Sequence, residues 1–273
     1  MTTLLQLSDT HFGTEQAPVT RALLELNREL RPDVVVLSGD ITQRARRSQF
    51  AAARAFIDLL SPPQLVSIPG NHDIPLFNLV ARTLSPYANY SRQFGRNLEP
   101  ELETDSLLIL GVNTTRPQRH TDGEVSKEQI ARVSARLARA SKQQLRIVVT
   151  HQPVHVIRDS DITNLLHGHD AAVHSWSAAG ADIVMGGHIH LPYVRPLSDR
   201  FGDLSRRIWS VQAGTAVSSR IRSKHANSVN VLRWPLALQV RPASQVCKVE
   251  RWDFDAGRGA FGMGEVSTLE VQR

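Results

Sequence analysis

Leu65-Val66-Ser67-Ile68-Pro69-Gly70-Asn71-His72-Asp73 sets the architecture of this chain, because a strand-like apolar run stops there at a turn that presents an amide, an imidazole and a carboxylate. Such polar groups are costly to bury unless something pairs with them. Ligands of open α/β sheets bind where neighbouring strands end, so we expect one polar site at one sheet edge. Four other apolar runs end in the same way, before Asp9 and His11, before Asp40, before His151, and before His188 and His190.

Helical segments alternate with these apolar runs. Apolar residues recur at helical spacing from Pro18 to Leu30, and a second helix is predicted from Gln49 to Leu60. The all-apolar run Val34 to Leu37 is typical of a central strand covered on both faces. Strand, helix and strand then form right-handed crossover units with parallel strands. Further along, the pattern predicts a strand over 106–112, a helix over 125–140 capped by Ser126, a strand ending at His151, and a helix over 168–179.

The chain changes character after His190. Closely spaced strand candidates predict an antiparallel second sheet packing on the first, within one domain over residues 1–273. The glycine-rich end, residues 255–273, is expected to be a flexible tail, and the irregular segment from Ile74 to Pro100 is expected to be a lid over the site. The strand candidates cover residues 193–197, 207–213, 228–234 and 245–254.

Composition narrows the class of protein. The 273 residues are 41% hydrophobic, enough for a large core, and neither a signal sequence nor a membrane-spanning run is visible, so we expect a soluble, cytoplasmic protein. Cys247 is the single cysteine, which excludes an internal disulfide and a thiolate metal cage. Its apolar surroundings favour an inert, packed thiol.

The net charge of +6 comes mostly from arginine. Arginine matches the geometry of phosphate groups, so an anionic substrate is consistent with this balance. The two arginine-rich groups, around Arg44 and around Arg220, are not interleaved with the aromatic residues on which nucleic acids stack. The sequence therefore does not favour nucleic acid as a partner.

The residues at the strand ends have the chemistry of a two-metal site. They offer carboxylate, amide and imidazole groups without sulfur, which suits manganese, iron, zinc or nickel better than magnesium. Two carboxylates are few for two ions, so one of them, Asp40, should bridge the pair. A bridged pair of ions can hold a hydroxide as nucleophile and clamp a phosphoryl oxygen.

Each motif alone has a structural interpretation. An Asp-x-His or a Gly-Asp pair at a strand end is often a turn or a cap, and a single histidine such as His151 is often a hydrogen-bonded structural residue. Five such motifs in this order, each after an apolar run, favour the metal site.

Together, these motifs resemble the complete signature of the calcineurin-like metallophosphoesterase superfamily. The residues that carry the resemblance are Asp9-x-His11, Gly39-Asp40, Gly70-Asn71-His72-Asp73, His151 and Gly187-His188-x-His190. The Gly-Asn-His-Asp ending and the modest length are similar to the class III cyclic-nucleotide phosphodiesterase branch. The resemblance implies an α/β fold, a four-layer αββα sandwich in which helices flank two mixed β-sheets.

The resemblance also implies roles for the residues. One metal would take Asp9, His11, Asp40 and His190, and the other would take Asp40, Asn71, His151 and His188. His72 would contact the phosphoryl group and assist the leaving oxygen, with Asp73 orienting it. The two ions would be divalent or trivalent, Mn²⁺, Fe²⁺/Fe³⁺ or Zn²⁺. As weaker candidates for substrate contact the sequence offers Arg44 after Asp40, Asn113 at a strand end, and His155 beyond His151.

The implied function is hydrolysis of a small phosphodiester by a metal-bridging hydroxide, with a 3′,5′-cyclic nucleotide as the favoured substrate. A phosphomonoesterase, a nuclease, a hydrolase of lipid headgroups or nucleotide pyrophosphates, and a non-catalytic scaffold stay open as alternatives. The lipid A pathway pyrophosphate hydrolases of the superfamily typically carry arginine where this chain has His72. A homodimer is also possible, since relatives often pair near the site.

Overall fold

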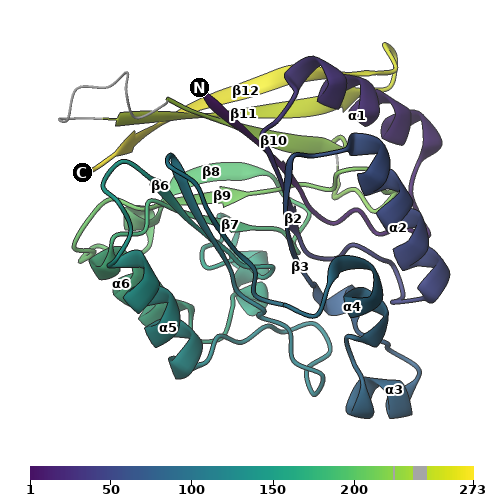
Figure 1. The fold of residues 1–273 in the computed structure, drawn as a ribbon, viewed down its shortest axis with the longest axis horizontal. Helices are drawn as coiled ribbons and strands as arrows, with labels where there is room; N and C mark the ends of the chain where they lie inside the picture. The colour runs from purple at the N-terminus through teal and green to yellow at the C-terminus, as the bar shows by residue number, and fades with distance from the viewer. Residues whose placement is uncertain (224, 236–244) are drawn as a thin grey trace.

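The computed structural model describes residues 1–223, 225–235 and 245–273. Its strands form two six-stranded sheets, both mixed (Figure 1). Sheet one has the order β12-β11-β10-β1-β2-β3, and its strands are β1 (Thr2–Leu7), β2 (Val34–Ser38), β3 (Gln64–Ile68), β10 (Ser228–Trp234), β11 (Gln245–Asp255) and β12 (Ala260–Val271). Sheet two has the order β4-β5-β6-β7-β9-β8, and its strands are β4 (Glu101–Glu103), β5 (Leu107–Gly111), β6 (Leu145–Val149), β7 (Ile183–Gly186), β8 (Tyr193–Pro196) and β9 (Trp209–Gln212).

Parallel strands lie at the centre of each sheet. In sheet one β1 pairs with β2 and β2 with β3, all parallel. In sheet two β5, β6, β7 and β9 form a parallel run, with β4 and β8 antiparallel at its edges. The predicted strand-helix-strand crossovers therefore occur in both sheets.

Helices cover the outer face of each sheet, which gives four layers (Figure 1). The helices α1 (Ala17–Leu30) and α2 (Arg47–Leu60) pack on sheet one, and α5 (Lys127–Leu137) and α6 (His169–Ala179) pack on sheet two. Between the sheets lies a third apolar core, in which Val36 and Ile68 face Ile147 and Met185. The predicted αββα sandwich is confirmed.

The local sequence explains where these helices begin. Pro18 lies in the first turn of α1, where its missing N–H group costs nothing. Ser126 caps α5 as predicted: its hydroxyl accepts a hydrogen bond from the Gln129 amide at 3.2 Å, and the Gln129 side chain accepts one from the Ser126 amide at 2.9 Å. This reciprocal pair is a capping box.

The prediction of a separate antiparallel sheet after His190 is wrong. β8 and β9 extend sheet two, with β9 parallel to β7, while β10, β11 and β12 complete sheet one. The periodicity of a sequence predicts that a segment is a strand, but it does not predict which strand that segment pairs with. Both sheets offer an open edge with a similar apolar face.

The prediction of a flexible tail over residues 255–273 is also wrong. Residues 260–271 form β12, which pairs with β11 along its whole length. Phe261, Leu269 and Val271 are buried, and a side chain at Gly264 would collide with Asp253. The glycines therefore mark close packing and a hairpin rather than disorder.

The segment predicted as a lid contains two short helices, α3 (Leu79–Leu84) and α4 (Ala88–Phe94). Tyr90 on α4 is fully buried and packs edge-on against Phe50 of α2. In contrast, α3 buries none of its residues. No helix in the described part of the chain combines the length and the hydropathy that a bilayer-spanning segment needs.

Candidate metal centre

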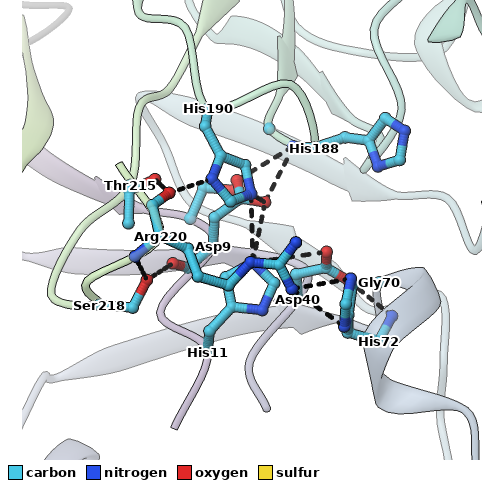
Figure 2. A network of polar contacts seen from close by, with 12 residues as sticks. Asp9, His11, Asp40, Gly70, His72, His188, His190, Thr215, Ser218 and Arg220 are labelled. Carbon is cyan, nitrogen blue, oxygen red and sulfur yellow. Dashed lines mark hydrogen bonds and ion pairs between the residues drawn. The ribbon is translucent and has the colours of Figure 1, made fainter. Parts of the chain in front are cut away.

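Five parallel strands deliver the predicted site residues. The loops after β1, β2 and β3 of sheet one, and after β6 and β7 of sheet two, meet at one edge of the sandwich. Figure 2 shows Asp9, His11, Asp40 and His190 of this site pointing toward one another. The loops bring together three overlapping groups of side chains. Within each group, the ligand atoms all lie within 4.8 Å of one another. These groups are Asp9, His11 and His190; His11, Asp40 and His72; and Asp40, His151 and His188.

The first group surrounds the Asp9 carboxylate. His190 Nε2 lies 3.3 Å from Asp9 Oδ1 and 3.2 Å from His11 Nε2. His11 Nε2 in turn lies 3.8 Å from Asp9 Oδ1 and 3.7 Å from Asp40 Oδ2. Two imidazole nitrogens and two carboxylates thus point to one small volume.

The group of Asp40, His151 and His188 surrounds the other oxygen of Asp40. His151 Nε2 lies 3.3 Å from Asp40 Oδ1 and 3.3 Å from Asn71 Oδ1. Oδ2 of Asp40 faces His11 and its Oδ1 faces His151, so a single carboxylate joins the two groups. This is the position that the sequence assigned to a bridging ligand.

Backbone carbonyls orient three of the imidazoles. His151 Nδ1 donates to Ser38 O at 2.9 Å, His72 Nδ1 donates to Gln43 O at 3.0 Å, and His190 Nδ1 donates to Arg220 O. In each ring Nε2 is left for the site, which is the arrangement that holds histidine ligands in metal centres. Buried Nδ1 atoms of His11 and His188 have no hydrogen-bond partner among the described residues.

Burial and mutual charge perturb the pKa values of these groups. Burial opposes ionisation of Asp9, but the attraction of His190 outweighs it and lowers the pKa of Asp9 to about 2. The pKa of Asp40 lies well below its ordinary value, because His151 and His72 overcome the cost of burial.

Burial lowers the pKa of His11 to about 3. Burial likewise lowers the pKa of His188 to about 4. For His151, burial is outweighed by the attraction of Asp40, which raises the pKa to about 9, and the attraction of Asp9 raises the pKa of His190 in the same way. The site therefore combines ionised carboxylates with neutral His11 and His188, and a bound metal ion would have to displace a proton from His151 and His190.

The backbone is strained at the same residues. Asp9, His11, Asp40, His188 and His190 all have positive φ, between 41° and 72°. Left-handed conformations cost a residue with a Cβ atom roughly 1–2 kcal/mol. Such strain persists where the surrounding structure imposes it and is frequent at functional sites.

The structure corrects the role predicted for Asp73. Its carboxylate accepts hydrogen bonds from the amides of Gly70, Ile41 and Thr42 at 2.8–3.0 Å, and the carbonyl of Gln43 is what contacts the His72 ring. Asp73 therefore ties the loop after β3 to the loop after β2. Burial and the nearby Asp40 raise its pKa to about 6.

The three candidates for substrate contact have different positions. Arg44 lines a cavity next to Asn71 and His72, as expected for a substrate contact. Asn113 instead uses Oδ1 to accept hydrogen bonds from the amide and hydroxyl of Thr115, which is a local turn. His155 is buried beside Tyr193. A strand end fixes where a residue lies but not which neighbours its side chain finds, so substrate contact by Asn113 or His155 stays a prediction.

Sequence reasoning missed Arg220 as an individual site residue. Its guanidinium points toward His72, with Nη1 3.2 Å from His72 Nε2 and 3.0 Å from Gln43 Oε1 (Figure 2). No carboxylate lies within ion-pair distance of Arg220 in the described ranges. Arg220 also lines a second cavity together with His188 and His190. The residue follows no ligand motif, so only its basic character was visible in the sequence.

Comparison with known proteins gives relatives of modest similarity. The chain is 29% identical over 164 residues to a glycerophosphodiester phosphodiesterase of Enterobacter lignolyticus, a match that covers 55% of this chain and 57% of that protein. It is 23% identical over 204 residues to a probable cyclic nucleotide phosphodiesterase of Synechococcus, covering 70% of this chain and 74% of that protein. The chain thus spans less than two thirds of the length of the first of these relatives.

A solved structure shares the fold over almost the whole chain. A dimetal phosphatase from Danio rerio superposes with a TM-score of 0.65 at 15% identity and covers 99% of both chains. The family model described as calcineurin-like phosphoesterase matches residues 2–192, which contain all five strand ends of the site. This chain belongs to the calcineurin-like phosphoesterase family.

Proposed function

We propose that this protein is a metal-dependent phosphodiesterase with two metal ions held at the edge of the sandwich. The observation that carries the proposal is the convergence of ligand atoms from five strand ends, with Asp40 shared between two groups. Membership of the phosphoesterase family and the phosphodiesterase names of the relatives support it.

The residues present fit two cations. The donors are carboxylate oxygens, an amide oxygen and imidazole nitrogens, and orphaned imidazole nitrogens lie buried at the site. Asp9, His11, Asp40 and His190 would hold one ion, and Asp40, Asn71, His151 and His188 the other. Two such ions, when bound, supply Lewis acidity and lower the pKa of water. Mn²⁺, Fe²⁺/Fe³⁺ and Zn²⁺ all suit this donor set.

His72 and Arg220 are the side chains that contact the phosphate group directly. The Gln43 carbonyl occupies His72 Nδ1, so Nε2, which accepts from Arg220 Nη1 at 3.2 Å, faces the reacting groups. When it carries a proton, Nε2 turns from this acceptor role to donating to the leaving oxygen, and Arg220 is released to the phosphate. The Arg220 guanidinium, without a carboxylate partner in the described part of the chain, binds a non-bridging phosphoryl oxygen. Arg44, across the adjacent cavity, contacts the substituent on the phosphate.

A 3′,5′-cyclic nucleotide is the substrate class we favour, in line with the relative from Synechococcus. A glycerophosphodiester is the second candidate, because the relative from Enterobacter lignolyticus is named for that reaction. Initial rates on 3′,5′-cyclic nucleotides, glycerophosphodiesters and a phosphomonoester with the same leaving group separate these substrates. Faster turnover of the monoester would contradict the phosphodiesterase assignment.

The metal-dependent activity itself is tested with bis(p-nitrophenyl) phosphate and Mn²⁺. We expect Asp40→Asn and Asn71→Ala to lose at least about 100-fold in kcat/KM while remaining folded. Asp58→Asn is the matched control, since Asp58 is an exposed aspartate on α2 paired with Arg54. Full activity of both site variants, or equal loss in the control, would refute the assignment.

A further inference from the structure

A short exposed segment carries large apolar side chains beside the metal centre. The exposed fractions of Phe77, Leu79, Val80 and Leu84 are 80%, 71%, 68% and 79%. Three of them belong to α3, which projects at a corner of the molecule beyond both sheets (Figure 1). Exposed apolar residues gathered in one place mark an interaction surface more often than residues scattered singly.

The exposure does not come from a loosely attached helix. Arg82 on α3 donates to three carbonyl groups, those of Pro117 at 2.6 Å, Arg119 at 2.7 Å and Pro75 at 3.1 Å. One guanidinium thus fastens α3 to the loop after β5. The fastening directs the apolar side chains outward.

Exposed arginines adjoin one end of this apolar segment, at Phe77. Arg44, Arg46 and Arg47 are exposed, and the Arg44 guanidinium lies 5.2 Å from the centre of the Phe77 ring. Neither residues 41–57 nor residues 74–98 contain an aspartate or a glutamate. We call Arg44, Arg46, Arg47, Phe77, Leu79, Val80 and Leu84 the α3 surface.

We propose that the α3 surface binds an anionic phospholipid membrane. Elements that lie in a membrane interface combine exposed large apolar residues with arginine or lysine, and they bind through apolar burial and attraction to anionic headgroups. A second copy of this chain fits less well. A two-fold dimer through this surface would place the same uncompensated arginines against each other, which is unfavourable.

The α3 surface adjoins the metal centre through two cavities. One is lined by Asn71, His72, Arg44 and Leu76, and the next by Arg44, Leu76, Phe77 and Arg46. Docking through α3 would therefore place these two cavities, which lead to the metal centre, next to the lipid headgroups. Phospholipid headgroups are themselves phosphodiesters. Membrane binding is measured without turnover, so its test is independent of the proposed catalytic function.

Flotation of the full chain with phospholipid vesicles tests the proposal. We expect binding to vesicles that contain phosphatidylglycerol, weaker binding to pure phosphatidylcholine, and release by salt. The triple variant Leu79→Gln/Val80→Gln/Leu84→Gln should bind about 100-fold more weakly. Glutamine suits the test because it is polar yet favours helix. Arg46→Ala/Arg47→Ala should weaken binding about tenfold.

The matched control changes three apolar residues that are exposed elsewhere, in Leu59→Gln/Met263→Gln/Val266→Gln. This variant should bind vesicles like the unmodified protein. Both triple variants should keep the unmodified melting temperature and the same hydrolysis of a water-soluble diester. Absence of vesicle binding, equal binding by the α3 variant, or conversion of a dimer to a monomer by the α3 substitutions would overturn the proposal.

Discussion

Arg220 shows how a single side chain can complete a site that its sequence motif does not announce. Its carbonyl accepts from His190 Nδ1, and its guanidinium lies 3.2 Å from His72 Nε2. The backbone of this residue thus orients a predicted metal ligand, while its side chain faces the position proposed for the substrate.

Substitution of Arg220 should separate substrate binding from metal binding. A hydrogen bond to a charged group contributes about 1.5–3 kcal/mol, so Arg220→Gln is expected to lower kcat/KM about 10–100-fold. Arg220→Lys should recover part of the lost kcat/KM, because lysine keeps the positive charge but lacks the planar guanidinium that can donate two parallel hydrogen bonds. Metal content should not change, since the carbonyl that orients His190 stays. Arg207→Gln, at an exposed ion pair with Glu270, is the control. Unchanged kinetics of Arg220→Gln would contradict the assignment.

Cys247 is the simplest residue to test. Its thiol is fully buried on β11, and burial raises its pKa far above the ordinary value. Because the thiolate is the reactive form, a thiol reagent such as dithionitrobenzoate should modify no cysteine in the native protein and one in denaturant. Rapid reaction without denaturant would show that sheet one opens at β11, the strand next to its edge.

At the scale of elements, the strand ends approach each other so closely that two glycines are required. A Cβ atom on Gly70 would lie 2.1 Å from the backbone nitrogen of Asp40, and one on Gly39 would lie 2.4 Å from His151 Nδ1. Neither collision involves a side chain that can move away, because Asp40 and His151 are themselves buried. The loops after β2, β3 and β6 are therefore fitted to one another.

The variant Gly70→Ala tests this fit. The methyl group should push the loop after β3 away from Asp40, so that bound metal falls at least about tenfold below that of the unmodified protein while the circular dichroism spectrum is unchanged. Gly202→Ala is the control, since a Cβ atom there would have no heavy atom within 4 Å. Normal metal content in Gly70→Ala would show that the site tolerates separation of the loops.

The elements themselves differ in how well the sequence predicts them. The sequence predicts buried strands before Asp40, His151 and His188, and the structure confirms them, because continuous apolar stretches are typical of parallel strands covered on both faces. The strand candidates after His190 are strands, but they divide between both sheets, and β12 forms where the sequence predicts a tail. Glycines weaken the alternation of β12, and strand pairing depends on contacts between distant residues that no local pattern encodes.

The sequence likewise predicts part of the candidate site, namely the positions of its residues but not all of their contacts. The strand ends gather all seven expected metal ligands, since backbone topology alone decides where a strand end lies. Side-chain contacts depend on packing instead. For that reason Asp73 accepts hydrogen bonds from backbone amides instead of contacting the His72 ring, and no sequence motif marks Arg220.

On the scale of the whole molecule, a charged cluster joins the two sheets. The Asp182 carboxylate, before β7, is buried among three guanidinium groups: Arg146 on β6 at 3.2 Å, Arg206 at 2.7 Å, and Arg273 after β12 at 3.3 Å. Arg273 follows a strand of sheet one, whereas Asp182 and Arg146 belong to sheet two. The cluster fastens the last strand of the chain across the sandwich.

Removing this one negative charge should therefore destabilise the fold. Asp182→Asn leaves buried arginines without their counter-ion, and breaking a buried pair in this way costs about 3–5 kcal/mol. Urea unfolding measures the loss, with Asp58→Asn expected to change stability by no more than about 0.5 kcal/mol because its ion pair is exposed. Equal stabilities of the two variants would mean that the cluster does not hold the sheets together.

Anomalous diffraction from crystals grown with Mn²⁺ measures directly whether two cations share Asp40. We predict two peaks about 3.5–4 Å apart, one among Asp9, His11 and His190 and the other among Asn71, His151 and His188, with Asp40 in contact with both. A single peak, or peaks outside these residues, would contradict this prediction.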